Sequence, residues 1–140
     1  MQRFTDLRVW ELSHGLALEV YKVTRGFPSE ERFGLTGQLR RAATSVAANI
    51  AEGSKRESNR DYGHFLNIAE GSVAEVEELL MLSRDLGLLV PEDAAGLLEK
   101  ADHVARMLAT LRAKVVKAAG LEVSRSTLDA RRSTGRAGGR

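Results

Sequence analysis

The stretch that decides the fold is QLRRAATSVAANIAEGS, residues 38–54. Leu39, Ala43, Val46 and Ile50 recur in it at the 3.6-residue period of an α-helix. Ser and Asn are poor choices inside a helix unless their side chains have partners. The stretch therefore predicts an amphipathic helix whose polar face contacts another group.

The same period occurs in three further stretches, around residues 9–23, 62–80 and 97–115. Thr5 or Asp6 is expected to cap the first of these helices. The predicted inward residues are Val9, Leu12, Leu16, Val20 and Val23, then Tyr62, Phe65, Ala69, Val73, Val76 and Leu80, then Leu97, Ala101, Val104, Leu108, Leu111 and Val115.

Capping and helix-breaking residues set the expected boundaries of these helices. Ser58 with Asp61 resembles a capping box, and Gly87 is a plausible C-cap. Pro91 suits the first position of the last helix, which Gly120 is expected to close. Four helices with short loops predict an all-α, up-down-up-down, left-handed four-helix bundle spanning residues 1–120.

Residues 121–140 have no apolar period and are expected to form a disordered Arg-rich tail. This tail carries five Arg and two acidic residues, so its net charge is +3. Because the whole chain has a net charge of +2, residues 1–120 carry −1. The chain has no Cys, which excludes thiol catalysis and Cys-ligated metal. We find no leader peptide and no apolar run long enough for a membrane span, which indicates a cytoplasmic protein.

A polar stripe follows the helix around residues 38–54 and continues just beyond it. At about 100° per residue its members fall within a sector of roughly 80°. We expect this stripe to be a functional or intersubunit patch, and the alternative is an ordinary solvated face. We also expect Asn49→Leu to disturb assembly or partner binding while leaving the helix content intact. The stripe consists of Gln38, Arg41, Ser45, Asn49, Glu52 and Arg56.

The hexapeptide NIAEGS occurs twice, at residues 49–54 and 67–72. In the first copy Ile50 is expected to face the core, with Gly53 at its edge. In the second copy Ala69 is expected to face inward while Ile68 points away. The two copies therefore do not predict a structural repeat.

Apolar and small residues also lie outside the predicted core. Gly63 and Gly71 each cost about 1 kcal/mol inside a helix relative to Ala, so another backbone is expected to approach there. We interpret the outward residues as an oligomer seam. The alternative is a helix buried on two sides of one bundle. The seam consists of Leu18, Ile68, Gly71 and Leu82.

Carboxylate and imidazole groups one turn apart raise the alternative of a ferritin-like metal site. The pairs are Glu11 with His14, Asp61 with His64, and Glu99 with His103. Because Glu11, Asp61 and His64 are expected to point away from the core, we predict no internal metal. We likewise predict no cofactor, no catalytic residues and no small-molecule substrate.

Nucleic-acid binding is the leading alternative function. Basic residues crowd the second helix and the loop after it, and a ring of copies would make them multivalent. Such binding would be driven by phosphate contacts and would depend steeply on salt. The candidate contacts are Arg40, Lys55, Arg60, Arg131 and Arg132.

Three segments closely resemble the four-helix-bundle family of proteins encoded in intervening sequences of bacterial 23S rRNA genes. They are FTDLRVWELSHGLALEVYKVT, FPSEERFGLTGQLRRAATSVAANIAEGSKRES and YGHFLNIAEGSVAEVEELLMLSRDLG, from about Phe4 to about Leu111. The resemblance implies a ring, usually a homopentamer, without established enzymatic activity. A distantly similar group, the accessory proteins of diversity-generating retroelements, binds nucleic acid and a reverse transcriptase. Unlike that group, this chain has a nearly neutral body.

These observations together predict a non-enzymatic homo-oligomeric scaffold or accessory protein, with RNA or a nucleoprotein as the alternative partner.

Overall fold

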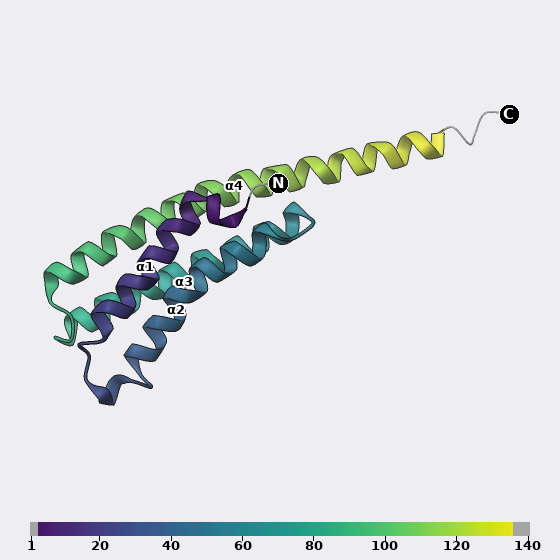
Figure 1. Cartoon of the computed structure of the whole chain (residues 1–140). Coiled ribbons are helices and arrows are strands. Elements are labelled where there is room, and N and C mark those ends of the chain that lie inside the picture. Colours follow the sequence, from purple (N-terminus) through teal and green to yellow (C-terminus); the bar gives the residue numbers. More distant parts are fainter. Residues whose placement is uncertain (1–2, 136–140) are drawn as a thin grey trace.

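The computed structural model describes residues 3–135, and the regular elements in that range are all helices. The elements are α1 (Arg8–Thr24), α2 (Leu35–Ser54), α3 (Asn59–Asp85) and α4 (Pro91–Gly135), with 3₁₀ turns η1 (Phe4–Asp6) and η2 (Ser29–Glu31). The predicted all-α fold with four helices is confirmed (Figure 1).

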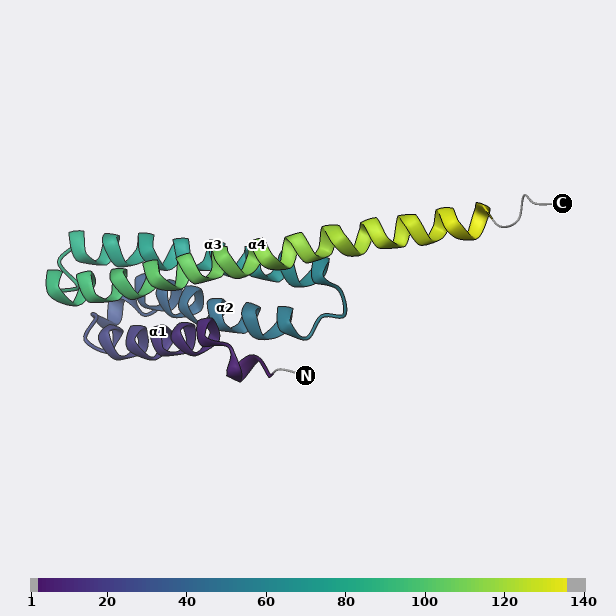
Figure 2. The same ribbon diagram turned by 90° about the horizontal axis from the view of Figure 1, so that it is seen from above.

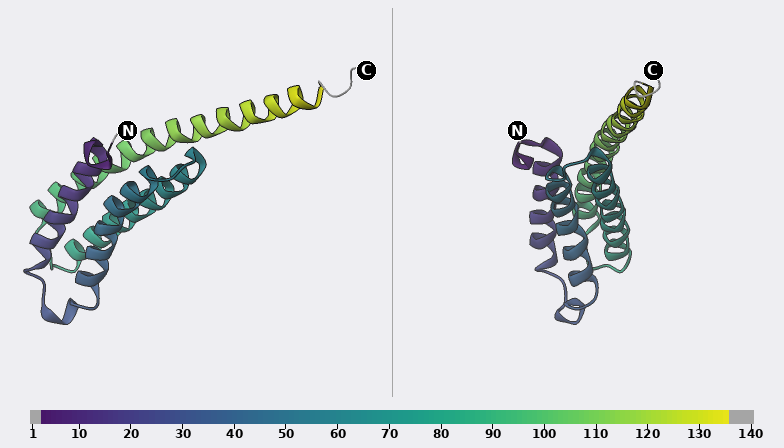
Figure 3. Two further views of the ribbon diagram at one scale, coloured as in Figure 1. Left: turned by 45° about the vertical axis from the view of Figure 1, so that its right-hand side comes forward. Right: turned by 90° about the vertical axis from the view of Figure 1, so that its right-hand side faces the viewer.

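Consecutive helices run antiparallel, and each contacts two neighbours. α1 lies against α2 and α4, and α3 lies against the same two helices. The α1–α2 and α3–α4 connections lie at one end of the bundle, whereas the α2–α3 turn lies at the other (Figure 2). Figure 3 shows the same arrangement of the helices from two further sides.

The core consists of the apolar stripes of all four helices. Leu16, Leu39, Ile50, Leu80 and Leu108 are buried almost completely. Each such side chain contributes about 1.5–3 kcal/mol by leaving water.

The side of α3 that faces the core differs from the prediction near the start of the helix. Tyr62 and Phe65 are only half-buried, whereas Leu66 is fully buried. The two aromatic rings lie instead beside the end of α2, where they contact the position of Gly53.

The helix boundaries follow local chemistry in three places. Ser58 accepts a hydrogen bond from the backbone N–H of Asp61, as the capping pattern predicts. Gly87 follows α3 with a φ of +77°, which favours glycine. Pro91 is the first residue of α4. The expected cap of α1 is wrong, because Thr5 and Asp6 lie in η1 and α1 begins after Leu7 without a side-chain cap.

The predicted end of the last helix is also wrong. α4 does not stop at Gly120 but continues to Gly135, past the α2–α3 turn (Figure 2). Residues 121–135 are therefore helical rather than disordered, and residues 120–135 are all exposed. A glycine costs a helix only about 1 kcal/mol, and good helix formers flank this one. Arg136 and Arg140 of the expected tail lie outside the described residues.

None of the helices in residues 3–135 combines the length and the apolar character needed to cross a membrane.

Candidate interaction surfaces

The α2–α3 crossing depends on the glycine in the first copy of NIAEGS. A Cβ atom at Gly53 would lie 2.8 Å from the Cβ of Phe65 and 3.0 Å from Cδ2 of Tyr62. Ile50, one turn earlier, is fully buried. The first copy is thus part of the packing that holds α2 against α3.

The middle of the predicted polar stripe forms a hydrogen-bonded cluster between α2 and α3. The hydroxyl oxygens of Ser45 and Ser72 lie 2.9 Å apart. The Asn49 amide donates to the Ser45 backbone oxygen at 2.8 Å and to its hydroxyl at 2.9 Å. Both side chains are partly buried and hydrogen-bonded, as residues of these types inside a helix require. Ser45 has its partner on α3 of the same chain and Asn49 has Ser45 itself, so a neighbouring subunit is not needed to satisfy them.

The rest of the stripe is divided between other contacts. Arg56 pairs with Glu52 at 2.8 Å, and its guanidinium lies 4.8 Å from the centre of the Phe65 ring. Gln38 and Arg41 are exposed and make no side-chain hydrogen bond within residues 3–135. Five of the six predicted residues therefore share a face of α2, Arg56 lies just after its end, and the six do not form one hydrogen-bonded group.

The predicted nucleic-acid contacts are also dispersed. Arg40 on α2 donates from Nε to the Thr24 hydroxyl at 2.9 Å, and its guanidinium lies 4.5 Å from the centre of the Tyr21 ring. It therefore connects α2 to the end of α1. Lys55 lies 6.0 Å from the centre of the Phe4 ring. The remaining candidates are the exposed Arg60 at the start of α3, and Arg131 and Arg132 on the projecting part of α4.

The predicted oligomer seam separates into two surfaces. Leu18, 61% exposed, lines a groove of about 360 Å³ between α1 and α2. Ile68 and Leu82, each 39% exposed, lie on α3, which does not contact α1. Gly71 on the same α3 face is exposed, and a Cβ atom there would meet nothing within 4 Å.

The two glycines that suggested a close backbone contact have different surroundings. A Cβ atom at Gly63 would lie 3.3 Å from a methyl group of Val116, so α4 of the same chain accounts for this glycine. Gly71 has no such neighbour within residues 3–135. The intrachain fold therefore explains only the first of the two.

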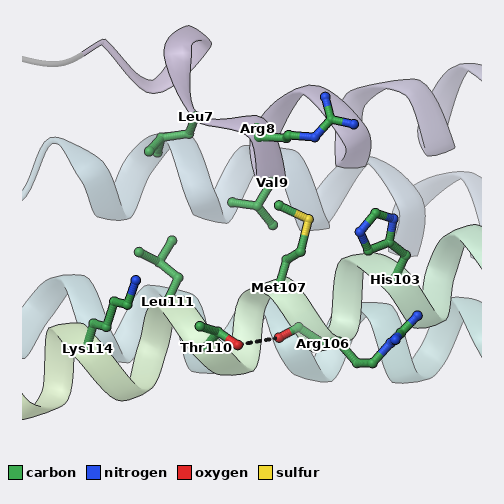
Figure 4. Close-up of a pocket in the computed structure, with 9 residues that line it drawn as sticks. All are labelled: Leu7, Arg8, Val9, His103, Arg106, Met107, Thr110, Leu111 and Lys114. Atoms are coloured by element: carbon green, nitrogen blue, oxygen red, sulfur yellow. Dashed lines mark hydrogen bonds between the residues drawn. The ribbon is translucent and has the colours of Figure 1, made fainter.

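A groove of about 380 Å³ between the start of α1 and the middle of α4 was missed from the sequence. Leu7, Val9, Met107 and Leu111 give it apolar walls (Figure 4). Its cationic lining residues are Arg8, Arg106 and Lys114, and His103 also lines it. The sequence feature that could have predicted this groove is the spacing of His103, Met107 and Lys114. This spacing places them on one side of the helix, next to the apolar residues that face the core.

The projecting part of α4 continues this phase. Lys117, Leu121, Arg125, Leu128 and Arg132 are spaced four, four, three and four residues apart. Together they occupy a sector of roughly 80° on the helix. Leu121 is 56% and Leu128 is 55% exposed. The segment that was expected to be a disordered tail thus presents an ordered cationic and apolar face.

The histidines of the three carboxylate–imidazole pairs lie beside aromatic rings or on the surface. His14 stacks on Trp10 with ring centres 4.9 Å apart, and His64 contacts the edge of Phe65 at 6.0 Å. Within residues 3–135, no group of three or more His, Asp or Glu side chains is placed to hold a metal ion.

Two ionisable groups on α3 are perturbed. Burial raises the pKa of the Tyr62 hydroxyl above 10.0, so the phenol stays neutral. The pKa of the Glu77 carboxyl is raised above 4.5, first by burial and then by the nearby Asp102. Within residues 3–135, neither the Tyr62 hydroxyl nor the Glu77 carboxyl is hydrogen-bonded to a serine or threonine hydroxyl.

Comparison with known proteins bears on the bundle but not on the projecting helix. The family model for the 23S rRNA-intervening sequence protein matches residues 5–110. A crystal structure of a protein of unknown function from the S23 ribosomal protein family of Bacteroides thetaiotaomicron matches with a TM-score of 0.68 and 24% identity. The match covers 74% of this chain and 97% of that one, and it shows the fold alone. A search of curated proteins gave no match. The resemblance seen in the sequence is thereby confirmed, and the chain belongs to the 23S rRNA-intervening sequence protein family.

Proposed function

We propose that the protein is a non-enzymatic, homo-oligomeric scaffold or accessory protein. The observation that carries this proposal is the outer face of α3, where Ile68 is exposed beside Gly71, and Leu82 and Leu86 are exposed farther along the same side toward the end of the helix. Exposed apolar residues gathered on one face mark an interaction surface. A glycine that packing among the described residues does not require fits the close approach of another helix. A ring of five subunits is the arrangement that the family resemblance implies.

The distribution of reactive groups supports a role without catalysis. The three histidines lie on different surfaces: His14 on α1, His64 on α3 and His103 on α4. None of them is hydrogen-bonded to a serine or threonine in the described part of the chain. Catalysis by a hydroxyl nucleophile needs such a base within reach.

The test is the molar mass of the intact protein by light scattering, compared with that of Ile68→Asp combined with Leu82→Asp. We expect a multiple of 15.3 kDa for the intact chain and a smaller particle for the double variant, with the same helix content by circular dichroism. Phe33→Asp is the matched control, because Phe33 is 88% exposed in the α1–α2 connection. An intact chain that is a monomer would contradict the proposal.

A second candidate function is RNA binding, and the projecting half of α4 favours it. Lys117, Arg125, Arg131 and Arg132 are exposed there, and none makes a salt bridge to a residue within the range 3–135. A structured RNA should then shift in an electrophoretic assay at low salt but not near physiological salt. Removal of residues 121–140 should abolish the shift. If the intact protein gives no shift at low salt, this candidate is excluded.

A further inference from the structure

The projecting half of α4 has two exposed leucines on a cationic face and no partner in its own bundle. Lys117, Leu121, Arg125, Leu128 and Arg132 form this face, which we call the α4 stripe. The acids of the same segment, Glu122 and Asp129, lie roughly 80–100° around the helix from its centre. The α4 stripe is therefore free of negative charge along its length.

This segment has little to stabilise it as an isolated helix. Residues 120–135 are all exposed, and the Asn59 side chain is the one bundle group hydrogen-bonded to this segment within residues 3–135. An isolated helix of this length is marginal in water, even with good helix-forming residues. Leucines spaced one heptad apart are suited to packing against a second helix.

The outer face of α3 has the complementary pattern. Ile68, Gly71, Glu75, Glu78 and Leu82 are spaced three, four, three and four residues apart, and we call them the α3 stripe. All five are exposed. Neither Glu75 nor Glu78 forms a salt bridge with any residue between 3 and 135.

The two stripes are similar in length and opposite in charge. Each has a charged centre, Arg125 in one and Glu75 with Glu78 in the other, between apolar residues on both sides. At 1.5 Å per residue the α4 stripe is about 22 Å long and the α3 stripe about 21 Å long. Gly71, at which a Cβ atom would meet nothing within 4 Å, leaves room for a second backbone.

We propose that the α4 stripe of one copy of this chain packs along the α3 stripe of a second copy. This inference rests on the homo-oligomeric function proposed above and names the contact that produces it. The same copy cannot make the contact, because α4 projects away past the α2–α3 turn (Figure 1). The α4-facing side of its own α3 is marked by Glu70, which pairs with Arg112 at 2.7 Å.

The contact has a consequence for assembly. Each copy donates one α4 stripe and accepts another, so the interface is heterologous and joins copies head to tail. Such contacts generate a closed ring if the rotation closes and a filament if it does not. The family model ends at residue 110, so the donating segment is a feature of this chain outside the matched region.

The test uses two charge-reversed variants and a third chain that carries all four substitutions. One variant carries Arg125→Glu and Arg132→Glu, and the other carries Glu75→Lys and Glu78→Lys. Each alone should weaken self-association at least tenfold in sedimentation velocity at physiological salt. The chain with all four substitutions should recover the wild-type association, because every contact then joins a reversed α4 stripe to a reversed α3 stripe, whatever the number of copies in the ring. Lys22→Glu with Arg25→Glu, on the far end of α1, controls for the change in net charge.

Each outcome decides the proposal. Loss in both variants with recovery in the chain that carries all four substitutions supports it. Wild-type assembly in both variants overturns this contact while leaving the oligomeric scaffold intact. A monomeric wild-type protein overturns both. If the α4 reversal abolishes binding of a structured RNA probe while assembly is unchanged, the α4 stripe is an RNA contact and the proposal is overturned. Loss in both variants without recovery in the chain with all four substitutions also overturns it.

Discussion

The two copies of NIAEGS have the same six letters and opposite relations to the core. In the first copy Ile50 is fully buried and Gly53 lies in the α2–α3 contact. In the second copy Ile68 is 39% exposed and a Cβ atom at Gly71 would meet nothing within 4 Å. Helical phase, and not residue identity, decides which positions are packed.

The difference separates residues that the subunit needs from residues that it leaves available. Gly53 is required because the rings of Tyr62 and Phe65 occupy the space of a side chain. Gly71 costs the helix about 1 kcal/mol, and a Cβ atom there would gain no compensating contact from the residues between 3 and 135. The second copy is thus the better candidate for a surface that contacts a neighbour.

The largest contrast is expected at the isoleucines. Ile50→Ala should lower the free energy of unfolding by about 2–5 kcal/mol, because it leaves a cavity in the core. Ile68→Ala should change it by less than about 1 kcal/mol in the separate subunit. Chemical denaturation at two protein concentrations measures both and separates folding from association. Equal losses in the two variants would contradict the assigned phases.

The glycines should give effects of opposite sign. Gly53→Ala should lower the free energy of unfolding by about 1–3 kcal/mol, since α2 and α3 must separate to admit the methyl group. Gly71→Ala should raise it by about 0.5–1 kcal/mol through helix propensity. Thermal unfolding at low protein concentration checks both signs. A stabilised Gly53→Ala variant would show that the close α2–α3 contact is not formed.

The serines should show a smaller contrast. Ser72→Ala removes the partner of the Ser45 hydroxyl and should cost about 1 kcal/mol. The Ser54 hydroxyl donates to the Ala51 backbone oxygen in its own helix. Ser54→Ala should therefore lower the free energy of unfolding by no more than about 0.5 kcal/mol. Denaturant midpoints with unchanged slopes would measure this difference. A greater loss at Ser54 than at Ser72 would argue against the α2–α3 cluster.

The smallest effect is expected at Glu77, which faces Asp102 between α3 and α4. Its pKa is raised in the folded state, so folding is favoured when the carboxyl is protonated and loses that advantage as the pH rises through the folded pKa. Glu77→Gln should therefore be slightly more stable than wild type at pH 7. The difference should vanish well below pH 4.5, the ordinary value of the carboxyl. Melting temperatures of both proteins across this pH range measure the difference in stability. A Glu77→Gln variant that is less stable than wild type at pH 7 would contradict the prediction.

The fold could be predicted because its signals are periodic and local. The 3.6-residue period, the Ser58 cap and the Gly87 turn depend on neighbours within a few residues, and all three are confirmed. The end of α4 could not be predicted from Gly120, because a glycine can end a helix or lie inside one. Only the structure shows that Gly120 does not adopt the positive φ that Gly87 has.

The surfaces were harder to predict because they depend on the relative rotation of the helices. One helix alone was enough to place Ser45 and Asn49 on a polar face, but Ser72, the partner of the Ser45 hydroxyl, lies 27 residues from Ser45. Leu18 and Ile68 both point outward, yet only the bundle shows that they belong to different surfaces. The groove between α1 and α4 likewise combines residues from both ends of the chain.

Whether the outward residues of the second copy serve a neighbour is tested most directly by hydrogen exchange of the intact protein at high and low concentration. Backbone amides of residues 121–134 should exchange slowly in the concentrated sample and lose that protection on dilution, because their helix is covered only in the assembly. Amides of residues 49–54 should exchange at the same slow rate in both samples. Equally rapid exchange of residues 121–134 at both concentrations would contradict the account.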